Sequence, residues 1–207
     1  MALVKYNNNS ISAVTSAASI PSGALVPIKT LTASSSSTLS FVHGSSDVIL
    51  DSTYPIYVFK YINVHPSEDG RSLCIQANAS GGSGFNESIT STIFRSFHNE
   101  ADSTANLSYD TGRDQANGTG VQRLELPSGN GNDESSSGEV WLFGISSTTF
   151  LKHFMGTSSN YEDNSASMNS FVGGYFNTTS ALDEFQFSMN SGNIDSGTIK
   201  LYGIKDS

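Results

Sequence analysis

The sequence is poor in cysteine and in long apolar runs. Its single cysteine, Cys74, excludes an internal disulfide framework, and its place in the strand-like segment "RSLCIQA" predicts a buried, inert thiol. No apolar run approaches the roughly 18 residues that a membrane-spanning helix needs. The opening "MALVKYNNNSISAV" lacks the basic start and continuous apolar stretch of a secretory signal. We therefore expect a protein that is made in the cytoplasm and does not insert into a membrane.

Charged side chains are also scarce, and those of positive sign most of all. Only 14% of the residues are charged, with 10 Lys and Arg against 19 Asp and Glu, and the net charge is −9. The basic residues are scattered singly, so no cluster is available to neutralise a phosphate backbone. We expect no nucleic-acid partner, and we interpret the acidity as a solvated surface that keeps the protein soluble.

Small polar residues and aromatics take the place of the missing charges. Ser, Thr, Gly and Asn supply 90 of the 207 residues, and 12 Phe, 8 Tyr and 1 Trp supply the aromatic side chains. This composition disfavours helices and favours short strands joined by turns. The aromatic content also argues against disorder for most of the chain.

Alternation of apolar and polar residues predicts the strands themselves. "YPIYVFKYINVH", residues 54–65, carries bulky residues on both faces, which is typical of a strand at the centre of a sheet or at an interface. "EFQFSM", residues 184–189, alternates as a half-buried strand does. Further strands are expected near residues 24–32, 38–42, 72–79, 89–97, 121–126, 140–145, 148–154, 171–176 and 198–204.

About ten short antiparallel strands without a helical period predict an all-β protein, either a sandwich or a barrel. We favour a jelly-roll-like β-sandwich formed by residues 25–207 as one domain. Residues 1–24 are rich in Asn, Ser and Ala and cannot build a core. We interpret them as an extended arm that lies on neighbouring subunits, and a frayed terminus is the alternative.

One phrase occurs twice. "SGEVWLFGI", residues 137–145, and "SGTIKLYGI", residues 196–204, share five identical positions. The repeat is explained by equivalent strands in two sheets, by two related half-motifs, or by convergence on a good strand sequence. In each case the last strand is expected to belong to the core.

The sequence contains no pattern of a catalytic or metal site. The four histidines, His43, His65, His98 and His153, stand far apart without metal-ligand spacing. "EADSTANLSYD" and "GNGNDESSSGE" carry oxygen ligands suited to Ca²⁺, but they lack the spacing of an EF-hand loop, and we interpret them as solvated turns. We expect no enzyme activity, no metal and no cofactor.

A loop suited to sugar recognition is the one candidate binding site. The segment "SSNYEDNS", residues 158–165, offers hydrogen-bonding groups and an aromatic ring on which a sugar can stack. The candidate binding residues are Tyr161, Asp163 and Asn164. An ordinary solvated loop is the alternative.

Several phrases together resemble a known family. "TASSSSTLSFV", "TYPIYVFKYINVHPSEDG", "ITSTIF" and "FVGGYFNTTSALDEFQFSMNSGNIDSGTIKLYGI" follow one another between Leu31 and Ile204. In this order they resemble virion structural proteins of marine tailed bacteriophages, of the cyanophage and pelagiphage groups. The resemblance implies a component of the phage particle surface, assembled in the bacterial cytoplasm with other virion proteins, and a closed homo-oligomer, with a trimer favoured.

The resemblance and the residues together lead to one preferred function and two alternatives. We expect a non-enzymatic tail-fibre or receptor-binding protein that recognises host cell-surface glycan through its polar, Tyr-bearing loops. The close alternative is a capsid decoration protein that clamps its neighbours with residues 1–24. A sugar-active enzyme would need clustered carboxylates on a strand face, which the sequence does not indicate.

Overall fold

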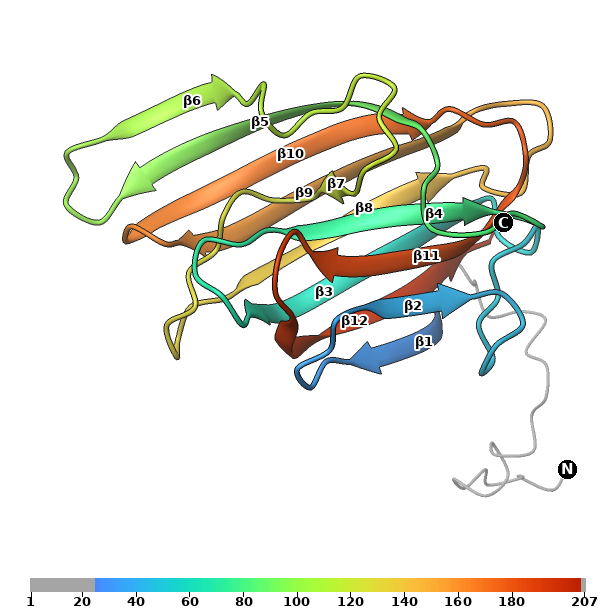
Figure 1. Ribbon diagram of the computed structural model, residues 1–207, viewed down its shortest axis with the longest axis horizontal. Coiled ribbons are helices and arrows are strands. Elements are labelled where there is room, and N and C mark those ends of the chain that lie inside the picture. The colour runs from blue at the N-terminus through green and yellow to red at the C-terminus, as the bar shows by residue number, and fades with distance from the viewer. Residues whose placement is uncertain (1–24, 206–207) are drawn as a thin grey trace, which may run out of the picture.

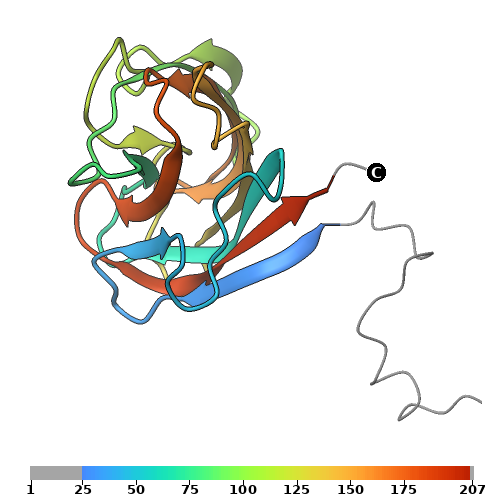
Figure 2. The ribbon, with the colours of Figure 1, turned by 90° about the vertical axis from the view of Figure 1, so that its right-hand side faces the viewer.

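The computed structural model describes residues 25–205, which form two antiparallel sheets packed face to face (Figure 1, Figure 2). The predicted β-sandwich is therefore confirmed, with twelve strands rather than about ten. Residues 1–24, interpreted above as an arm, lie outside the described residues. The strands are β1 (Val26–Thr32), β2 (Leu39–Val42), β3 (Ile56–Pro66), β4 (Leu73–Ala79), β5 (Ile89–Asn99), β6 (Ala105–Tyr109), β7 (Gln122–Arg123), β8 (Ser136–Phe143), β9 (Lys152–Glu162), β10 (Ala166–Phe176), β11 (Leu182–Met189) and β12 (Ile194–Ile204).

Eight of these strands follow the order of a jelly roll. The large sheet begins with the order β1-β12-β3-β8, and the small sheet has the order β2-β11-β4-β7. The chain therefore passes to the other sheet at every step of β1-β2-β3-β4 and of β7-β8-β11-β12, as two Greek keys do. This order is the expected jelly-roll arrangement.

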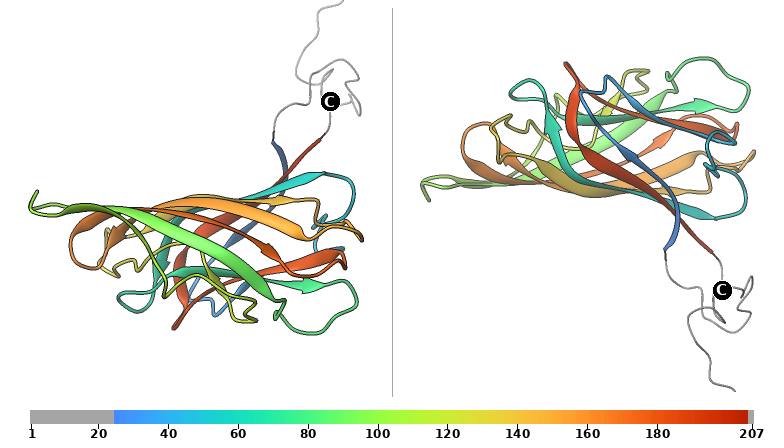
Figure 3. Two further views of the ribbon diagram at one scale, coloured as in Figure 1. Left: turned by 90° about the horizontal axis from the view of Figure 1, so that it is seen from above. Right: turned by 90° about the horizontal axis from the view of Figure 1, so that it is seen from below.

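Two hairpins are inserted into this frame. The β5–β6 hairpin lies between β4 and β7 in the chain, and the β9–β10 hairpin lies between β8 and β11. Because β9 pairs with β8 and β10 pairs with β5, the hairpins extend the large sheet to eight strands. The β5–β6 hairpin projects beyond the other strands at the end of the sandwich that lies away from the C-terminus (Figure 3).

β3 is the central strand of the jelly-roll part of the large sheet, as its sequence predicts. It lies between β12 and β8, and Tyr57, Val58 and Phe59 are completely buried. The ring of Phe59 packs edge-to-face on Phe41 of β2 and on Phe187 of β11, with ring centroids 4.9 Å apart in both pairs. This aromatic cluster joins the two sheets.

The repeated phrase marks the two strands that flank β3. Residues 137–143 of the first copy lie on β8 and residues 196–204 lie on β12, so the repeat belongs to one sheet and not to two. Val140 is paired with Phe59, whereas Ile199 is paired with Tyr61, so the copies are offset by two residues along β3. An offset of two keeps the same alternate side chains facing the core. The final strand is part of the core, as expected.

The prediction for residues 148–165 is wrong in its boundaries. The strand expected over residues 148–154 is β9, Lys152–Glu162, so residues 158–162 of the supposed loop are strand. β6 was missed altogether. Gly156, Ser158 and Asn160 occupy the buried positions of β9, where an apolar residue would have revealed the alternation.

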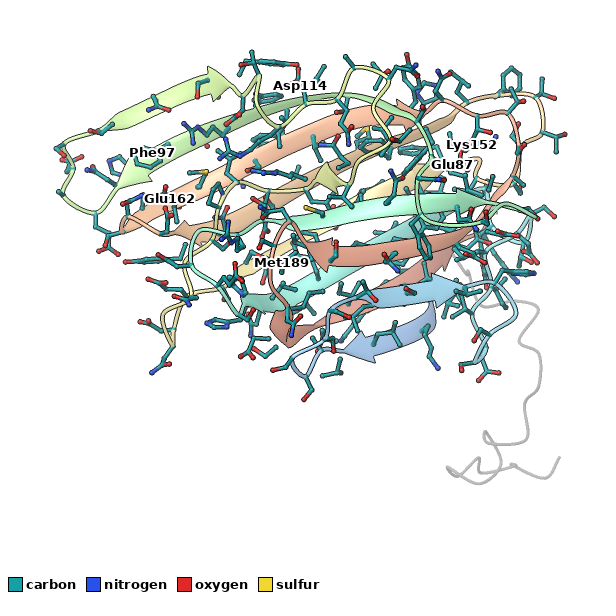
Figure 4. All side chains as sticks on the ribbon, in the orientation of Figure 1. Glu87, Phe97, Asp114, Lys152, Glu162 and Met189 are labelled. Atoms are coloured by element: carbon teal, nitrogen blue, oxygen red, sulfur yellow. The ribbon has the colours of Figure 1, made fainter. Side chains whose placement is uncertain are left out.

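Burial changes the titration of several side chains, three of which are Cys74, Lys152 and Glu125. It raises the pKa of the Cys74 thiol to about 12, which fits the predicted inert cysteine. It lowers the pKa of Lys152, whose Nζ donates hydrogen bonds to the carbonyl oxygens of Phe150 and Thr178 and which lies beside Glu87 in Figure 4. It raises the pKa of Glu125 to about 7.

Glu125 follows β7 in the connection to β8, and it is completely buried. Its Oε1 accepts hydrogen bonds from the Leu73 N–H at 3.0 Å and from the Ser128 hydroxyl at 3.3 Å. Its Oε2 and the hydroxyl of Tyr61 have no hydrogen-bond partner among the described residues. A neutral carboxyl costs less in this place than an ionised one.

We predict that the protein loses stability as the pH rises through Glu125's titration. The unfolded chain releases this proton near the ordinary pKa of 4.5, but the folded protein holds it to about 7. The contribution is fully present below about pH 4.5 and is lost by about pH 7, and it amounts to about 3 kcal/mol at 1.36 kcal/mol per pKa unit. Urea unfolding across this pH range measures how the free energy of unfolding depends on pH.

The neutral variant Glu125→Gln should make the fall in the free energy of unfolding less steep across this pH range, and the remaining slope is assigned to Asp163, whose pKa burial raises from 3.8 to about 6. Glu100→Gln, at an exposed position of the β5–β6 turn, is the control and should leave the fall unchanged. An equally steep fall in Glu125→Gln would show that another group causes the dependence.

Candidate functional site

The face of the large sheet that is turned away from the small sheet, here called the outer face, carries an aromatic patch. Directly opposed residues on neighbouring strands share a face of the sheet. Phe171 of β10 is opposed by Phe94 of β5, and Phe94 is opposed by Tyr109 of β6. In the other direction the same row continues through Thr157, Glu139 and Lys60. One row therefore changes from aromatic to charged residues within six strands.

An aromatic hollow of about 330 Å³ opens in this row between β5, β8, β9 and β10. Its walls are Phe94 and Phe171 on one side and Trp141 and Met155 on the other, and its further lining is Thr92, Glu139, Gly156, Thr157, Val172 and Gly173. The Phe94 and Phe171 rings are stacked, with centroids 5.0 Å apart and planes 12° apart. The hollow is thus walled by three aromatic rings and one methionine side chain.

Gly173 keeps the hollow open. A Cβ at this position would point into open space and meet only the backbone oxygen of Phe154 at 3.9 Å. The next residue, Gly174, faces inward, and a Cβ there would approach the Thr90 oxygen to 2.5 Å. The two neighbouring glycines therefore serve opposite faces of the sheet, one for space at the surface and one for close packing inside.

Glu139 is the fixed polar group of the aromatic hollow. Its Oε1 accepts a hydrogen bond from the Trp141 Nε1–H at 2.8 Å, and its Oε2 lies 3.0 Å from the Lys60 Nζ. The hydrogen bond from Trp141 and the charge of Lys60 lower the pKa of Glu139, against the opposing effect of partial burial. The carboxylate is therefore ionised at neutral pH and acts only as a hydrogen-bond acceptor.

These side chains suit a ligand that has an apolar face and a rim of hydroxyl groups. Aromatic walls bind the C–H face of such a ring, while a carboxylate and threonine hydroxyls take part in hydrogen bonds at its edge. Lys60 lines neither wall and is already paired with Glu139, so the hollow offers little to a phosphate or another anion.

The structure does not bring the three candidate residues from the sequence into one site. Tyr161, at the end of β9, lines a polar hollow of about 380 Å³ together with His98, Asn99, Glu100, Ser135, Ser159, Asn160 and Ser167. Asp163 and Asn164 lie in the β9–β10 turn, outside this lining. The Asn164 side chain donates hydrogen bonds to Asp163 at 2.8 Å and to Glu162 at 3.2 Å, so it supports its own turn.

Sequence reasoning missed the residues of the aromatic hollow. It placed Phe94, Trp141 and Phe171 in strands, but it did not assign them to a common surface. Trp141 alternates with the buried Val140 and Leu142, and Phe94 follows the buried Ile93. This alternation was the available signal that the rings face outward. The pairing of β5 with β10, which brings Phe94 to Phe171, leaves no local trace in the sequence.

Comparisons with protein-family models, with curated proteins and with solved structures found no match. Among residues 25–205, no group of three or more His, Cys, Asp or Glu side chains is arranged to hold a metal ion. Within the same residues, no helix has the length and hydropathy to span a membrane.

We predict that the two glycines respond oppositely to substitution. Gly173→Val should change the free energy of unfolding by no more than about 0.5 kcal/mol, because its side chain enters open space on a strand. Gly174→Ala should destabilise the protein by about 2 kcal/mol or more, because backbone and Phe154 atoms occupy the space. Urea unfolding of both variants tests whether Gly173 lies on the outer face and Gly174 on the inner face. Similar losses of unfolding free energy in the two variants would contradict this assignment.

Proposed function

We propose that this protein is a non-enzymatic structural component of a tailed-phage virion that is displayed on the particle exterior and recognises host-surface glycan. The jelly-roll sandwich supports this proposal at the level of architecture, because both viral capsid domains and lectins use it. Architecture alone does not define a function. The resemblance between Leu31 and Ile204 supports the virion role.

The observation that carries the glycan role is the aromatic hollow. Its stacked phenylalanines and its tryptophan–carboxylate pair provide an aromatic surface for a sugar ring and an acceptor for its hydroxyl groups. Glu139 is the only carboxylate in its lining and is paired with Lys60. Glycoside hydrolysis ordinarily uses two carboxyl groups, so this lining favours binding over catalysis.

The positions of the chain ends fit display on a particle. Val26 is paired with Gly203, so both ends of the described chain leave the sandwich at the same end. The β5–β6 and β9–β10 turns lie at the opposite end, where Figure 4 places Phe97 and Glu162. If the particle holds the end with the termini, the outer face remains accessible.

We predict that glycan binding depends on the aromatic hollow. Trp141 is the only tryptophan, so its fluorescence reports binding at this place. In titrations with an array of bacterial surface oligosaccharides, Phe171→Ala should weaken the affinity about tenfold, which corresponds to the loss of one stacking contact. Gly173→Val should have a similar effect by filling the hollow. Phe150→Ala is the control, because Phe150 is equally apolar and 72% exposed but lies outside the lining.

Equal affinities in all three variants would contradict a role for the hollow, and the absence of binding to every oligosaccharide would contradict glycan recognition.

The decoration alternative makes a different prediction. A decoration protein should bind empty capsids, and deletion of residues 2–24 should abolish that binding. Gold-labelled antibody on purified virions distinguishes tail-fibre tips from the capsid lattice.

A further inference from the structure

The described residues contain four edge strands, and three of them are protected against pairing. The sheet orders place β1 and β6 at the edges of the large sheet and β2 and β7 at the edges of the small sheet. β1 contains Pro27, Lys29 and a bulge between them, which are three common means of blocking an edge. β2 has four residues and β7 has two, so neither offers a long edge.

β6 lacks the proline, the charge and the bulge that protect β1, and it is longer than β2 and β7. Its five residues, "ANLSY", include no proline and no charge, and its pairing with β5 runs without a bulge. Among residues 25–205, no strand pairs with its other side. Leu107, at its centre, is 72% exposed, and Tyr109 is 49% exposed.

The hydrogen-bond pattern shows which residues of β6 present a free backbone. The Asn99 N–H donates to the Thr104 carbonyl at 3.1 Å, and the Asp110 N–H donates to the Ile93 carbonyl at 3.0 Å. In an antiparallel pair, alternate residues of a strand bond to the neighbouring strand. Because residues 104 and 110 bond to β5, residues 106 and 108 do so as well. Ala105, Leu107 and Tyr109 therefore turn their N–H and C=O groups away from the sheet.

We propose that β6 pairs with β6 of a second copy of this chain, antiparallel and about a two-fold axis at Leu107. The three free residues are symmetric about Leu107, so Leu107 faces its own copy and Ala105 faces Tyr109 of the second copy. Each facing pair can exchange two backbone hydrogen bonds. This pairing joins the two large sheets into one continuous sheet.

The side chains of β6 are complementary to themselves in this register. On the outer face, the large Tyr109 meets the small Ala105 of the second copy, and the two exposed Leu107 side chains cover each other. On the other face, Asn106 meets Ser108, a pair that can hydrogen-bond. An isologous contact requires a surface that fits itself, and this strand fulfils the requirement at every position.

The distribution of charge also favours a second copy of this chain as the partner of β6. Two copies that each carry a net charge of −9 repel one another, so a contact between them needs an uncharged surface. β6 has no ionisable side chain other than Tyr109, whose hydroxyl is hydrogen-bonded to Asp114 at 2.6 Å. The first charge beyond the strand, Asp110, is neutralised by Arg113 at 2.8 Å. The inference is independent of any glycan binding.

The oligomeric state of the full chain tests the proposal. Light scattering coupled to gel filtration, from micromolar to millimolar protein, should show a concentration-dependent dimer. Leu107→Lys should weaken dimerisation at least tenfold, since it places two ammonium groups at the axis. Phe150→Lys introduces the same charge at a site that is also 72% exposed, and it should leave the dimer intact. Circular dichroism and unfolding midpoints check that both variants fold.

A cross-link locates the axis. Leu107→Cys should form a disulfide-linked dimer on oxidation, because directly paired strand residues lie within disulfide distance and Cys74 is buried. Phe150→Cys should not do so at the same rate. A monomer at every concentration, a trimer, or a dimer that Leu107→Lys leaves unchanged would each overturn the proposal.

Discussion

The constraint on which the rest of this structure depends is the inequality of its two sheets. A four-stranded sheet cannot cover the inner face of an eight-stranded sheet, so the long connection from β6 to β8 must cover part of it. That connection lies against the sheet through polar contacts. The Gln115 N–H donates a hydrogen bond to the Ser91 hydroxyl at 2.9 Å, and the Asn160 amide donates to the Pro127 carbonyl at 2.9 Å. A connection that is not paired with a neighbouring strand needs such hydrogen-bond partners, because its buried backbone groups would otherwise remain unsatisfied.

This constraint also explains the unusual interior of β9 and β10. Gly156, Ser158 and Ser170 lie buried where a sandwich usually has branched apolar residues. Ser170 accepts a hydrogen bond from the Leu126 N–H, so the polar residue serves the covering connection. Glu125 belongs to the same connection. Because this connection covers the sheet, it buries the carboxyl group of Glu125, and burial raises the pKa of that group. The jelly-roll half, by contrast, is held by the aromatic cluster around Phe59.

The sequence was sufficient where apolar residues mark a strand and insufficient where they do not. β11 alternates clearly and β3 carries bulky residues on both faces, so the fold class and the central position of β3 could be predicted. β9 could not be bounded, because its buried residues are as polar as its exposed ones. The aromatic hollow depends on the register between two inserted hairpins, which brings Phe94 to Phe171 across 77 positions of the chain. No local pattern encodes that contact. Of the three candidate residues from the sequence, Tyr161 lines a polar hollow, whereas Asp163 and Asn164 belong to a turn.

Both proposed surfaces lie mainly on the inserted hairpins, and the jelly-roll frame contributes Glu139 and Trp141 of β8. The frame forms the sandwich, whereas β5, β9 and β10 wall most of the aromatic hollow and β6 supplies the free edge. Pairing through β6 would place two such hollows on one continuous outer face, separated by the strands β5 and β6 of both copies. A five-residue edge is a small contact, so it gains most where a particle already holds copies close together. Two hollows held in a fixed relation can engage one polymeric ligand with an avidity that neither has alone. The same arrangement would be useful to an adhesin and unnecessary for a decoration protein, so the oligomeric state also bears on which of the two functions the hairpins serve.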